Sequence, residues 1–452
     1  MITTPLDDWI SVKTGASDYD TLRAYQLEKL RGVLAYVKSH SRYYSKHLSN
    51  IEPAGIQAIE DAGQIPFTTS DMLIESPLDF VCVAPDDIGR IITIPTSGTT
   101  APPKRIFFTA DDQELTLDFF HHGMMTLAAE NDRVLIFLPG KKAGSIGDLL
   151  ARALERFDCR GIIHGPVDDY TEASRALATA GATCAVGLPA QLFALSRFCP
   201  GIKLKSVLLC SDHVSASITH ALECAWDCEV FSHYGMIESG LGGGVDCRAH
   251  TGYHMREADI LFEIVDPVSG EPIPDGESGE IVFTTLTRRG MPLIRYKTGD
   301  FSRVLTDPCP CGSWLRRFDC VSGRVSGIVE TGNGCKISVP ALDEILFAVP
   351  GLIGFSAEAA GKAGADTLMI AVFAENYPQV TCEAERRLRE DDYIGNCVKQ
   401  GFLKLELRQG GPEILTYGNT KRSISRNSKV AVQSVPGSDS LCPAQRSRSP
   451  AP

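Results

Sequence analysis

The most informative segment of the chain is Ile94-Pro95-Thr96-Ser97-Gly98-Thr99-Thr100-Ala101-Pro102-Pro103-Lys104-Arg105. An apolar run over 91–94 leads into it and a second run over 106–108 follows it, so two strands are predicted to flank a polar loop. A loop of Ser, Thr and Gly can turn backbone N–H groups and hydroxyls toward a phosphate. The segment contains no G-x-x-x-x-G-K-[ST] pattern, which excludes a Walker A loop here. Taken alone, it fits an ordinary hairpin turn as well as a phosphate cradle.

The length and charge of the chain restrict its class. Because 452 residues exceed what one hydrophobic core usually supports, we expect two or more domains. A formal net charge of −12 argues against a nucleic-acid surface and against an anionic membrane patch. No apolar run approaches the length of a membrane span, and the first residues lack the basic and apolar regions of a signal peptide. These features predict a cytoplasmic protein that keeps its 15 cysteines reduced.

The chain divides into segments that differ in hydrophobic periodicity and composition. A helical period marks the start of the chain, and short apolar runs then alternate with amphipathic stretches, which predicts α/β layers with partly parallel sheets. The texture changes after Gly323-Arg324, and the chain ends in a Ser-, Pro- and Arg-rich tail. The predicted parts are a large N-terminal domain over 1–323 with a helical region at 18–48 and a β-rich part at about 260–322, a small α+β domain over 324–425, and a disordered tail over 426–452.

Four further segments carry side chains suited to nucleotide chemistry. In His233-Tyr234-Gly235-Met236-Ile237-Glu238, an aromatic ring, a glycine and a carboxylate at a strand end can stack a base and hold Mg²⁺. In Tyr296-Lys297-Thr298-Gly299-Asp300, the aspartate can accept hydrogen bonds from both ribose hydroxyls. Gly323-Arg324 and the lysine of Gly418-Asn419-Thr420-Lys421-Arg422 add two cations, and a mobile lysine can neutralise developing negative charge. Each segment alone also fits a plain turn or a solvated surface.

Taken in this order, the segments resemble the adenylate-forming superfamily of acyl-CoA synthetases, adenylation domains and luciferases. The segments Ile65–Thr69, Phe283–Arg288 and Met291–Tyr296 are similar to the phenylacetate–CoA ligase branch. The resemblance covers roughly residues 20–425. It implies the adenylate-forming synthetase fold, with a large multi-layer domain and a small mobile domain. It also implies a two-step reaction, in which ATP activates an aryl or related small carboxylic acid to an acyl-adenylate and coenzyme A then displaces AMP.

The resemblance implies a role for each motif residue. The phosphate loop and its lysine would cradle the β- and γ-phosphates, Tyr234 with Gly235 would pack on adenine, and Glu238 would ligate Mg²⁺. Asp300 and Arg324 would hold the ribose, and Lys421 would bridge the carboxylate and the α-phosphate before the small domain rotates. The implied nucleotide-binding residues of the phosphate loop are Thr96, Ser97, Gly98, Thr99, Thr100 and Lys104.

Four positions depart from the family pattern. Ala101 stands where the phosphate loop usually has glycine, and Ile237 replaces a hydroxyl residue, which would remove a hydrogen bond worth about 1–3 kcal/mol. Val325-Ser326-Gly327 lacks the acidic pair of the family's hinge. The family lysine directly follows a glycine, and aligning on Gly418 would put Asn419 in its place. These departures leave open a slow enzyme, an acyl-protein ligase that transfers to a protein thiol, or a catalytically impaired nucleotide-binding regulator.

A second group of residues has the composition of a structural zinc site. Cys309-Pro310-Cys311-Gly312 is a knuckle-like pair, and Cys247 and His254 lie upstream, with His250 as a competing ligand. Three thiolates and one imidazole make a closed tetrahedral Zn²⁺ site. Some relatives in the phenylacetate–CoA ligase branch look similar here. The expected ligands and partners are therefore ATP, Mg²⁺, coenzyme A, a small acid and structural Zn²⁺, and a homodimer is also compatible with the sequence.

Overall fold

The structure is a computed structural model that describes residues 4–94, 103–324, 328–330, 334–362, 365–415 and 422–426. The first residues form a helical layer. The predicted helix over 18–48 is confirmed, but it is broken at Ser41, whose extended backbone and hydroxyl cap a second helix. A preceding helix was not predicted, although Thr4 caps it and Pro5 begins it. The helices are α1 (Pro5–Thr14), α2 (Tyr19–His40), α3 (Arg42–His47) and α4 (Ser70–Glu75).

The hairpin predicted around the polar loop is confirmed. β1 (Arg90–Ile94) pairs antiparallel with β2 (Lys104–Phe108), and Ile94 lies opposite Lys104. The phosphate-loop residues between them, Thr96 to Ala101, lie outside the described residues. The register therefore fixes where the loop begins and ends.

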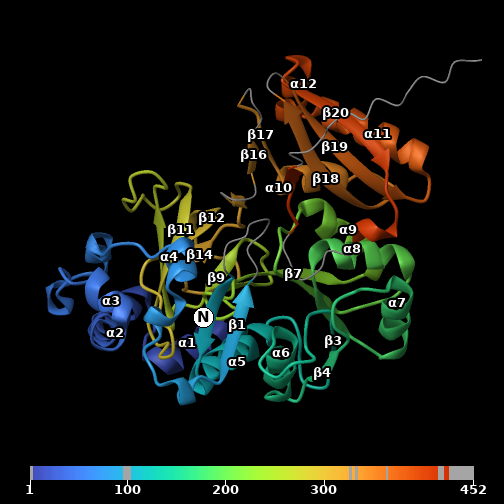
Figure 1. The fold of residues 1–452 in the computed structure, drawn as a ribbon. Coiled ribbons are helices and arrows are strands. Elements are labelled where there is room, and N and C mark those ends of the chain that lie inside the picture. Colours follow the sequence, from blue (N-terminus) through green and yellow to red (C-terminus); the bar gives the residue numbers. More distant parts are fainter. Residues whose placement is uncertain are drawn as a thin grey trace, which may run out of the picture.

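A nine-stranded mixed sheet forms the centre of the large part of the molecule (Figure 1). Its parallel half confirms the α/β prediction, since short apolar strands, buried except for the edge strand β4, alternate with amphipathic helices. The parallel strands are β3 (Arg133–Ile136), β4 (Arg160–Ile163), β5 (Cys184–Gly187), β6 (Ser206–Leu209) and β7 (Glu229–Tyr234). The helices around them are α5 (Ala110–Met124), α6 (Ile146–Glu155), α7 (Tyr170–Thr179), α8 (Pro189–Phe198) and α9 (Ala216–Trp226).

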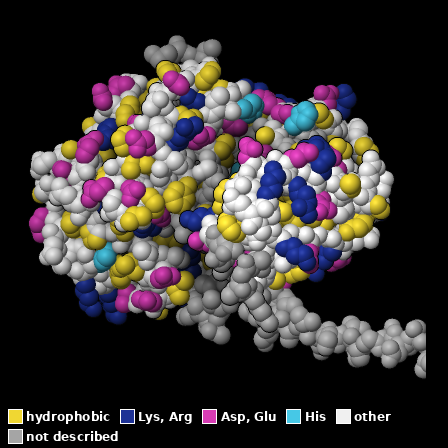
Figure 2. Space-filling model, turned by 90° about the horizontal axis from the view of Figure 1, so that it is seen from above, with side chains coloured by type: hydrophobic (Ala, Val, Ile, Leu, Met, Phe, Trp, Pro, Cys, Tyr) yellow, Lys and Arg dark blue, Asp and Glu magenta, His cyan; other side chains and the backbone are white. Residues whose placement is uncertain are grey.

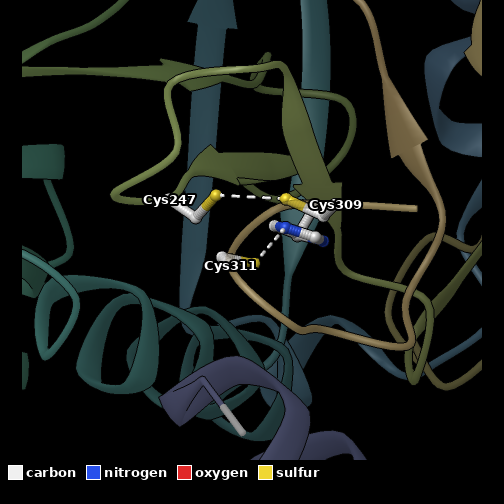
Figure 3. Close-up of side chains that lie close together, drawn as sticks. Cys247, Cys309 and Cys311 are labelled. Carbon is white, nitrogen blue, oxygen red and sulfur yellow. Dashed lines mark hydrogen bonds between the residues drawn. The ribbon is translucent and has the colours of Figure 1, made fainter. Parts of the chain in front are cut away.

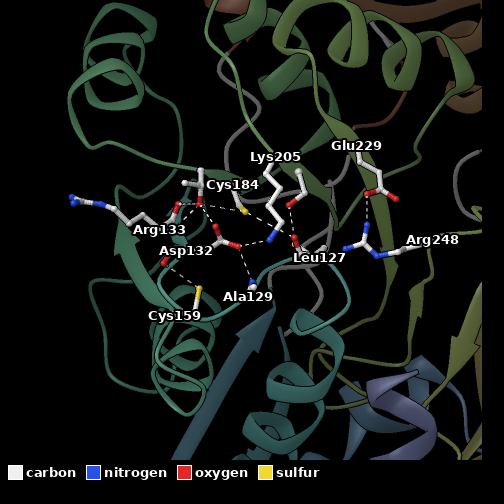
Figure 4. A network of polar contacts seen from close by, with 11 residues as sticks. Leu127, Ala129, Asp132, Arg133, Cys159, Cys184, Lys205, Glu229 and Arg248 are labelled. Atoms are coloured by element: carbon white, nitrogen blue, oxygen red, sulfur yellow. Dashed lines mark hydrogen bonds and ion pairs between the residues drawn. The ribbon is translucent and has the colours of Figure 1, made fainter. Parts of the chain in front are cut away.

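A polar network ties together the amino ends of the parallel strands (Figure 4). Asp132, just before β3, accepts hydrogen bonds from the Thr183 hydroxyl at 2.9 Å and from the Lys205 ammonium at 2.7 Å. Although burial opposes the shift, these bonds hold the pKa of Asp132 below its usual value. The opposite, carboxyl ends of parallel strands are where α/β sheets usually bind ligands.

The second half of the central sheet is antiparallel. It consists of β8 (Gly244–Asp246), β9 (Tyr253–Met255), β13 (Val304–Leu305) and β14 (Arg317–Phe318). The expected β-rich part contains a further four-stranded sheet of β10 (Ile260–Val265), β11 (Gly279–Thr285), β12 (Tyr296–Ser302) and β15 (Gly323–Arg324). In it, Asp300 of β12 lies opposite Arg324 of β15.

The C-terminal residues form their own sheets and helices, drawn in orange and red above α8 and α9 in Figure 1. The expected hinge, Val325 to Gly327, lies outside the described residues, and so does the predicted tail over 426–452 except for Arg426, which belongs to β21. The elements are β16 (Ile328–Glu330), β17 (Lys336–Ser338), α10 (Val339–Leu346), β18 (Leu352–Lys362), β19 (Ala365–Ala374), α11 (Tyr377–Glu390), α12 (Asp392–Lys399), β20 (Leu403–Gln409) and β21 (Ser425–Arg426).

One disulfide corrects the expectation that all cysteines are reduced. Cys335, just before β17, is bonded to Cys397 of α12, with 6.5 Å between their Cα atoms. The two cysteines are 62 residues apart, so their spacing gives no local sign of the pairing. The remaining described cysteines are free, and most of them are buried.

The surface carries charges of both signs. In Figure 2, Lys and Arg side chains are interspersed with Asp and Glu over the face seen from above, so that face offers no extended area of one sign. Within the described residues, no helix is both long enough and apolar enough to span a membrane.

Candidate active site

The first group of predicted site residues meets where the hairpin approaches the end of β7. Lys104, the first residue of β2, forms an ion pair with the carboxylate of Glu238. Its ammonium also donates to the hydroxyls of Ser70 and Tyr296, each at 3.2 Å. The Tyr296 hydroxyl in turn donates to Glu238 Oε1 at 3.1 Å. Because the lysine and glutamate side chains are only 13% and 8% exposed, their pairing is shielded from water.

The second group centres on Asp300, which is 2% exposed. Arg324 donates from Nε to Asp300 Oδ1 at 2.5 Å and from Nη2 to Oδ2 at 3.1 Å, a two-point contact that fixes the carboxylate plane. The Tyr234 hydroxyl donates to Asp300 Oδ2 at 3.3 Å. The structure thus brings together the three residues predicted to hold the adenine and the ribose.

Each group takes one residue from the end of β7 or the turn after it and one residue from β12. Tyr234 ends β7 and Glu238 follows it in the next turn, while Tyr296 and Asp300 lie at the beginning and the middle of β12. The turn needs Gly235, because a Cβ there would lie 2.6 Å from the carbonyl oxygen of Leu241. The end of β7 with its following turn, and β12, therefore position the base-binding and the phosphate-side residues together.

The buried tyrosines of both groups are held neutral. Burial raises the pKa of Tyr234 well above its usual value, and the nearby Asp300 carboxylate raises it further. Burial and the Glu238 carboxylate act on the pKa of Tyr296 in the same direction. Both phenols therefore remain protonated hydrogen-bond donors near neutral pH.

Three contacts of the site were not predicted from the sequence. Ser70, at the start of α4, contacts Lys104, and the Tyr296 hydroxyl bridges Lys104 and Glu238. The buried Arg288 donates to the backbone carbonyl of Glu238 at 2.7 Å, and burial lowers its pKa to about 10. Ser70 follows the segment Ile65–Thr69 and Arg288 ends the segment Phe283–Arg288, but neither segment indicates a contact with Lys104 or Glu238, which only the tertiary fold shows.

Several predicted site residues cannot be placed. Thr96, Ser97, Gly98, Thr99, Thr100 and Lys421 lie outside the described residues. Arg422, the neighbour of Lys421, is described: its guanidinium pairs with Asp343 of α10 and donates to Asp212 at 3.2 Å. Asp212 lies just beyond β6, at the same sheet edge as Tyr234. The chain next to Lys421 is therefore held at the carboxyl ends of the parallel strands.

The cysteine and histidine side chains predicted to bind zinc converge. One potential ligand atom from each of Cys247, His254, Cys309 and Cys311 lies within 4.8 Å of all the others. Figure 3 shows the three labelled thiols turned toward a common centre. The Cys247 and Cys309 sulfurs are 3.6 Å apart, and Cys311 Sγ lies 3.4 Å from His254 Nε2. Tetrahedral Zn²⁺ bonds of roughly 2.0–2.3 Å imply ligand separations of about 3.3–3.8 Å, so the donor set fits this ion.

The competing ligand His250 is engaged elsewhere. Its Nδ1 lies 2.9 Å from an Asp246 oxygen and its Nε2 lies 3.2 Å from a Glu229 oxygen. These carboxylates raise the pKa of His250, chiefly through the Asp246 hydrogen bond. The structure therefore favours His254 as the histidine of the cluster.

Comparison with known proteins identifies the family. A family profile described as AMP-binding enzyme matches residues 19–286, which is more than half of the chain. The chain belongs to this family of AMP-binding enzymes, and its fold is that of the adenylate-forming enzymes, as the motif order predicted.

Individual relatives agree with this assignment. The phenylacetate–coenzyme A ligase of Thermus thermophilus is 25% identical over 346 residues, covering 74% of this chain and 77% of the relative. The phenylacetate–coenzyme A ligase of Aromatoleum evansii is 25% identical over 335 residues, covering 68% and 71%. Among solved structures, a 2-hydroxyisobutyryl-CoA ligase in the postadenylation state superposes with a TM-score of 0.75 at 20% identity, covering 89% of each chain.

Proposed function

We propose that this protein is an AMP-forming carboxylate–CoA ligase, which activates a small carboxylic acid with ATP and transfers the acyl group to coenzyme A. The observation that carries the proposal is the joint position of two pairs: Lys104–Glu238 joins β2 to the turn after β7, and Asp300–Arg324 joins β12 to β15. Family membership and the phenylacetate–coenzyme A ligase relatives support the same reaction.

The first half-reaction needs charge neutralisation around a phosphoryl group. Lys104 would meet the β- and γ-phosphates together with the loop from Thr96 to Thr100, and Glu238 would hold Mg²⁺. Asp300 would accept hydrogen bonds from the ribose hydroxyls, while Arg324 keeps its carboxylate in position. Tyr234 would pack against adenine.

Lys421, near the C-terminus, would act in the same half-reaction. Lys421 would neutralise charge between the acid carboxylate and the α-phosphate, and the position of Arg422 beside β6 supports this. We propose that residues 324–425 act as a small domain that rotates after adenylation. Such a rotation would separate Arg422 from Asp212 and Phe347 from Phe193, whose rings now lie 4.7 Å apart.

Zinc would have a structural role. Bound by Cys247, His254, Cys309 and Cys311, it would supply no chemistry to the acid but would join the loop after β8 to the segment before β14. Ser313 of that segment also donates to Asp7 of α1 at 2.7 Å, so the cluster would fix the N-terminal helix as well.

The test is pyrophosphate exchange with ATP, Mg²⁺ and a broad panel of aryl and aliphatic acids, followed by thioester analysis after addition of coenzyme A. We expect exchange with at least one acid and AMP release coupled to acyl-CoA. Lys421→Ala should abolish exchange but still convert a supplied acyl-adenylate to thioester, with Asn419→Ala as the matched control. Exchange without thioester formation would favour a protein-thiol acceptor, and ATP binding without exchange would favour a regulator.

A further inference from the structure

An apolar cavity lies next to the nucleotide residues, at the carboxyl ends of the parallel strands. Helices α5 and α6 cover it, and its empty space, counted out to the solvent opening, is about 400 Å³. Because this figure includes open solvent, it is an upper bound on the room for a ligand. Its lining residues are Phe119, Phe120, Gly123, Met124, Leu138, Ile146, Leu150, Val186, Leu208, Cys210, His233 and Val245.

The lining restricts the ligand. Among these residues there is no Lys, Arg, Asp or Glu, so an ammonium group or a second carboxylate would be left without a counter-charge. The small volume disfavours long acyl chains, and the Phe119 and Phe120 rings offer flat apolar surface. The body of the acid is therefore compact and apolar.

Two side chains in the lining bring polar atoms, and only one of them is unsatisfied. The Cys210 thiol donates to the carbonyl oxygen of Gly187 at 3.7 Å. His233 Nε2, in contrast, is buried and has no hydrogen-bond partner among the described residues. Its ring lies between two aromatic neighbours, with its centroid 6.1 Å from that of Phe119 and 6.2 Å from that of Phe120.

Leaving a buried imidazole nitrogen unpaired costs free energy, so such a group in a ligand cavity calls for a ligand that pairs with it. Burial also lowers the pKa of His233 to about 4, which keeps the ring neutral near pH 7. A neutral imidazole nitrogen either accepts or donates one hydrogen bond. A hydroxyl group can satisfy either tautomer, since it is both a donor and an acceptor.

We propose that His233 is a specificity-determining residue that selects a compact apolar acid carrying one neutral hydroxyl group. The proposal rests on the proposed ligase function, because it assigns this cavity to the body of the acid. His233 directly precedes Tyr234, so a carboxylate aimed at the nucleotide site would place the rest of the acid in this cavity.

The experiment compares phenylacetate, 4-fluorophenylacetate and the 3- and 4-hydroxyphenylacetates, together with isobutyrate and its hydroxylated analogues, in pyrophosphate exchange. We expect a hydroxylated acid to exceed its unsubstituted or fluorinated partner by roughly 10- to 100-fold in kcat/KM. His233→Leu should remove this preference, and His233→Gln should restore part of it. Cys210→Ala, in the same lining, should change the rates but preserve the ratio.

A ratio near one in the wild type, or a ratio that survives in His233→Leu, would overturn the proposal. Thermal melting and ATP calorimetry establish that each variant is folded. If no acid supports exchange, the ligase function fails on its own. The selectivity is then read from acid binding by ligand-observed NMR, comparing wild type with His233→Leu. Equal binding of hydroxylated and fluorinated acids by the wild type would reject the role of His233.

Discussion

The ammonium of Lys104 and the carboxylate of Glu238 are paired with each other in a site shielded from water. If Lys104 binds phosphate and Glu238 binds Mg²⁺, the two side chains must separate when the Mg²⁺–nucleotide binds. Lys104 would then contact a phosphate group, and Glu238 would contact the metal ion. Until the ligand binds, each of the two buried side chains serves as the counter-charge of the other.

We therefore expect Lys104→Ala to lower pyrophosphate exchange by about 10²–10³-fold, the loss typical of removing one preorganised charge contact. Glu238→Gln should lower exchange as well, and excess Mg²⁺ should restore part of it. Lys297→Ala is the control, because its ammonium pairs with Glu280 and with no member of the Lys104 group. Unchanged exchange in Lys104→Ala would remove the lysine from the site.

Asp300 provides a test of nucleotide binding. Replacing it by Ala removes the acceptor for Tyr234 and leaves Arg324 without its buried counter-charge. We expect the KM for ATP to rise by about 10- to 100-fold, measured at saturating acid. Asp319→Ala, which breaks the exposed pair with Arg303, should leave that KM unchanged. A comparable change in both variants would point to general destabilisation.

Metal content tests the cysteine cluster. Cys309→Ala should release the zinc that we expect in purified wild type, measured by elemental analysis, and should lower the melting temperature by several degrees. A strong chelator should have the same effect on the wild type. Cys382→Ala, an exposed cysteine of α11, should retain the metal. Absence of zinc in the wild type would reject the site.

Asp132 gives the stability a defined pH dependence. Its pKa is lowered in the folded protein, so its contribution is present above the unfolded value of about 3.8 and is lost as the pH falls through the folded value. We expect Asp132→Asn to lower the free energy of unfolding by about 1–3 kcal/mol at pH 7. The difference from wild type should shrink below pH 4 in denaturant titrations. A constant difference from pH 7 to pH 3 would contradict the charge-based account.

Local signals in the sequence were sufficient for much of the fold. The run Ile91–Ile94 and its partner Ile106–Phe108 predicted the hairpin, because short apolar runs around a polar turn have few alternatives. The helical period over 18–48 predicted α2 and α3, but not the break at Ser41, whose hydroxyl caps the second helix. The helix α1 had a signal in Thr4, Pro5 and Asp7, which form a capping box with proline at the first position.

Local sequence patterns predicted fewer of the contacts in the candidate active site. The motif order named Tyr234, Asp300 and Arg324, which the structure brings together, but no pattern indicated that Lys104 would pair with Glu238. That contact joins residues 134 positions apart through the fold of two sheets. The Cys335–Cys397 disulfide was not predicted for the same reason, since the two cysteines are 62 residues apart in the sequence.

The strand β7 has a consequence for how this protein can change. Successive side chains of a strand point to opposite sides, so Tyr234 turns to the nucleotide residues while His233 turns to the apolar cavity. Two adjacent residues of β7 thus face different substrates: Tyr234 faces the nucleotide, and His233 faces the cavity proposed for the acid. Side-chain substitution at His233 can alter the choice of acid, whereas an insertion or deletion in this strand would exchange the two faces and disable both at once.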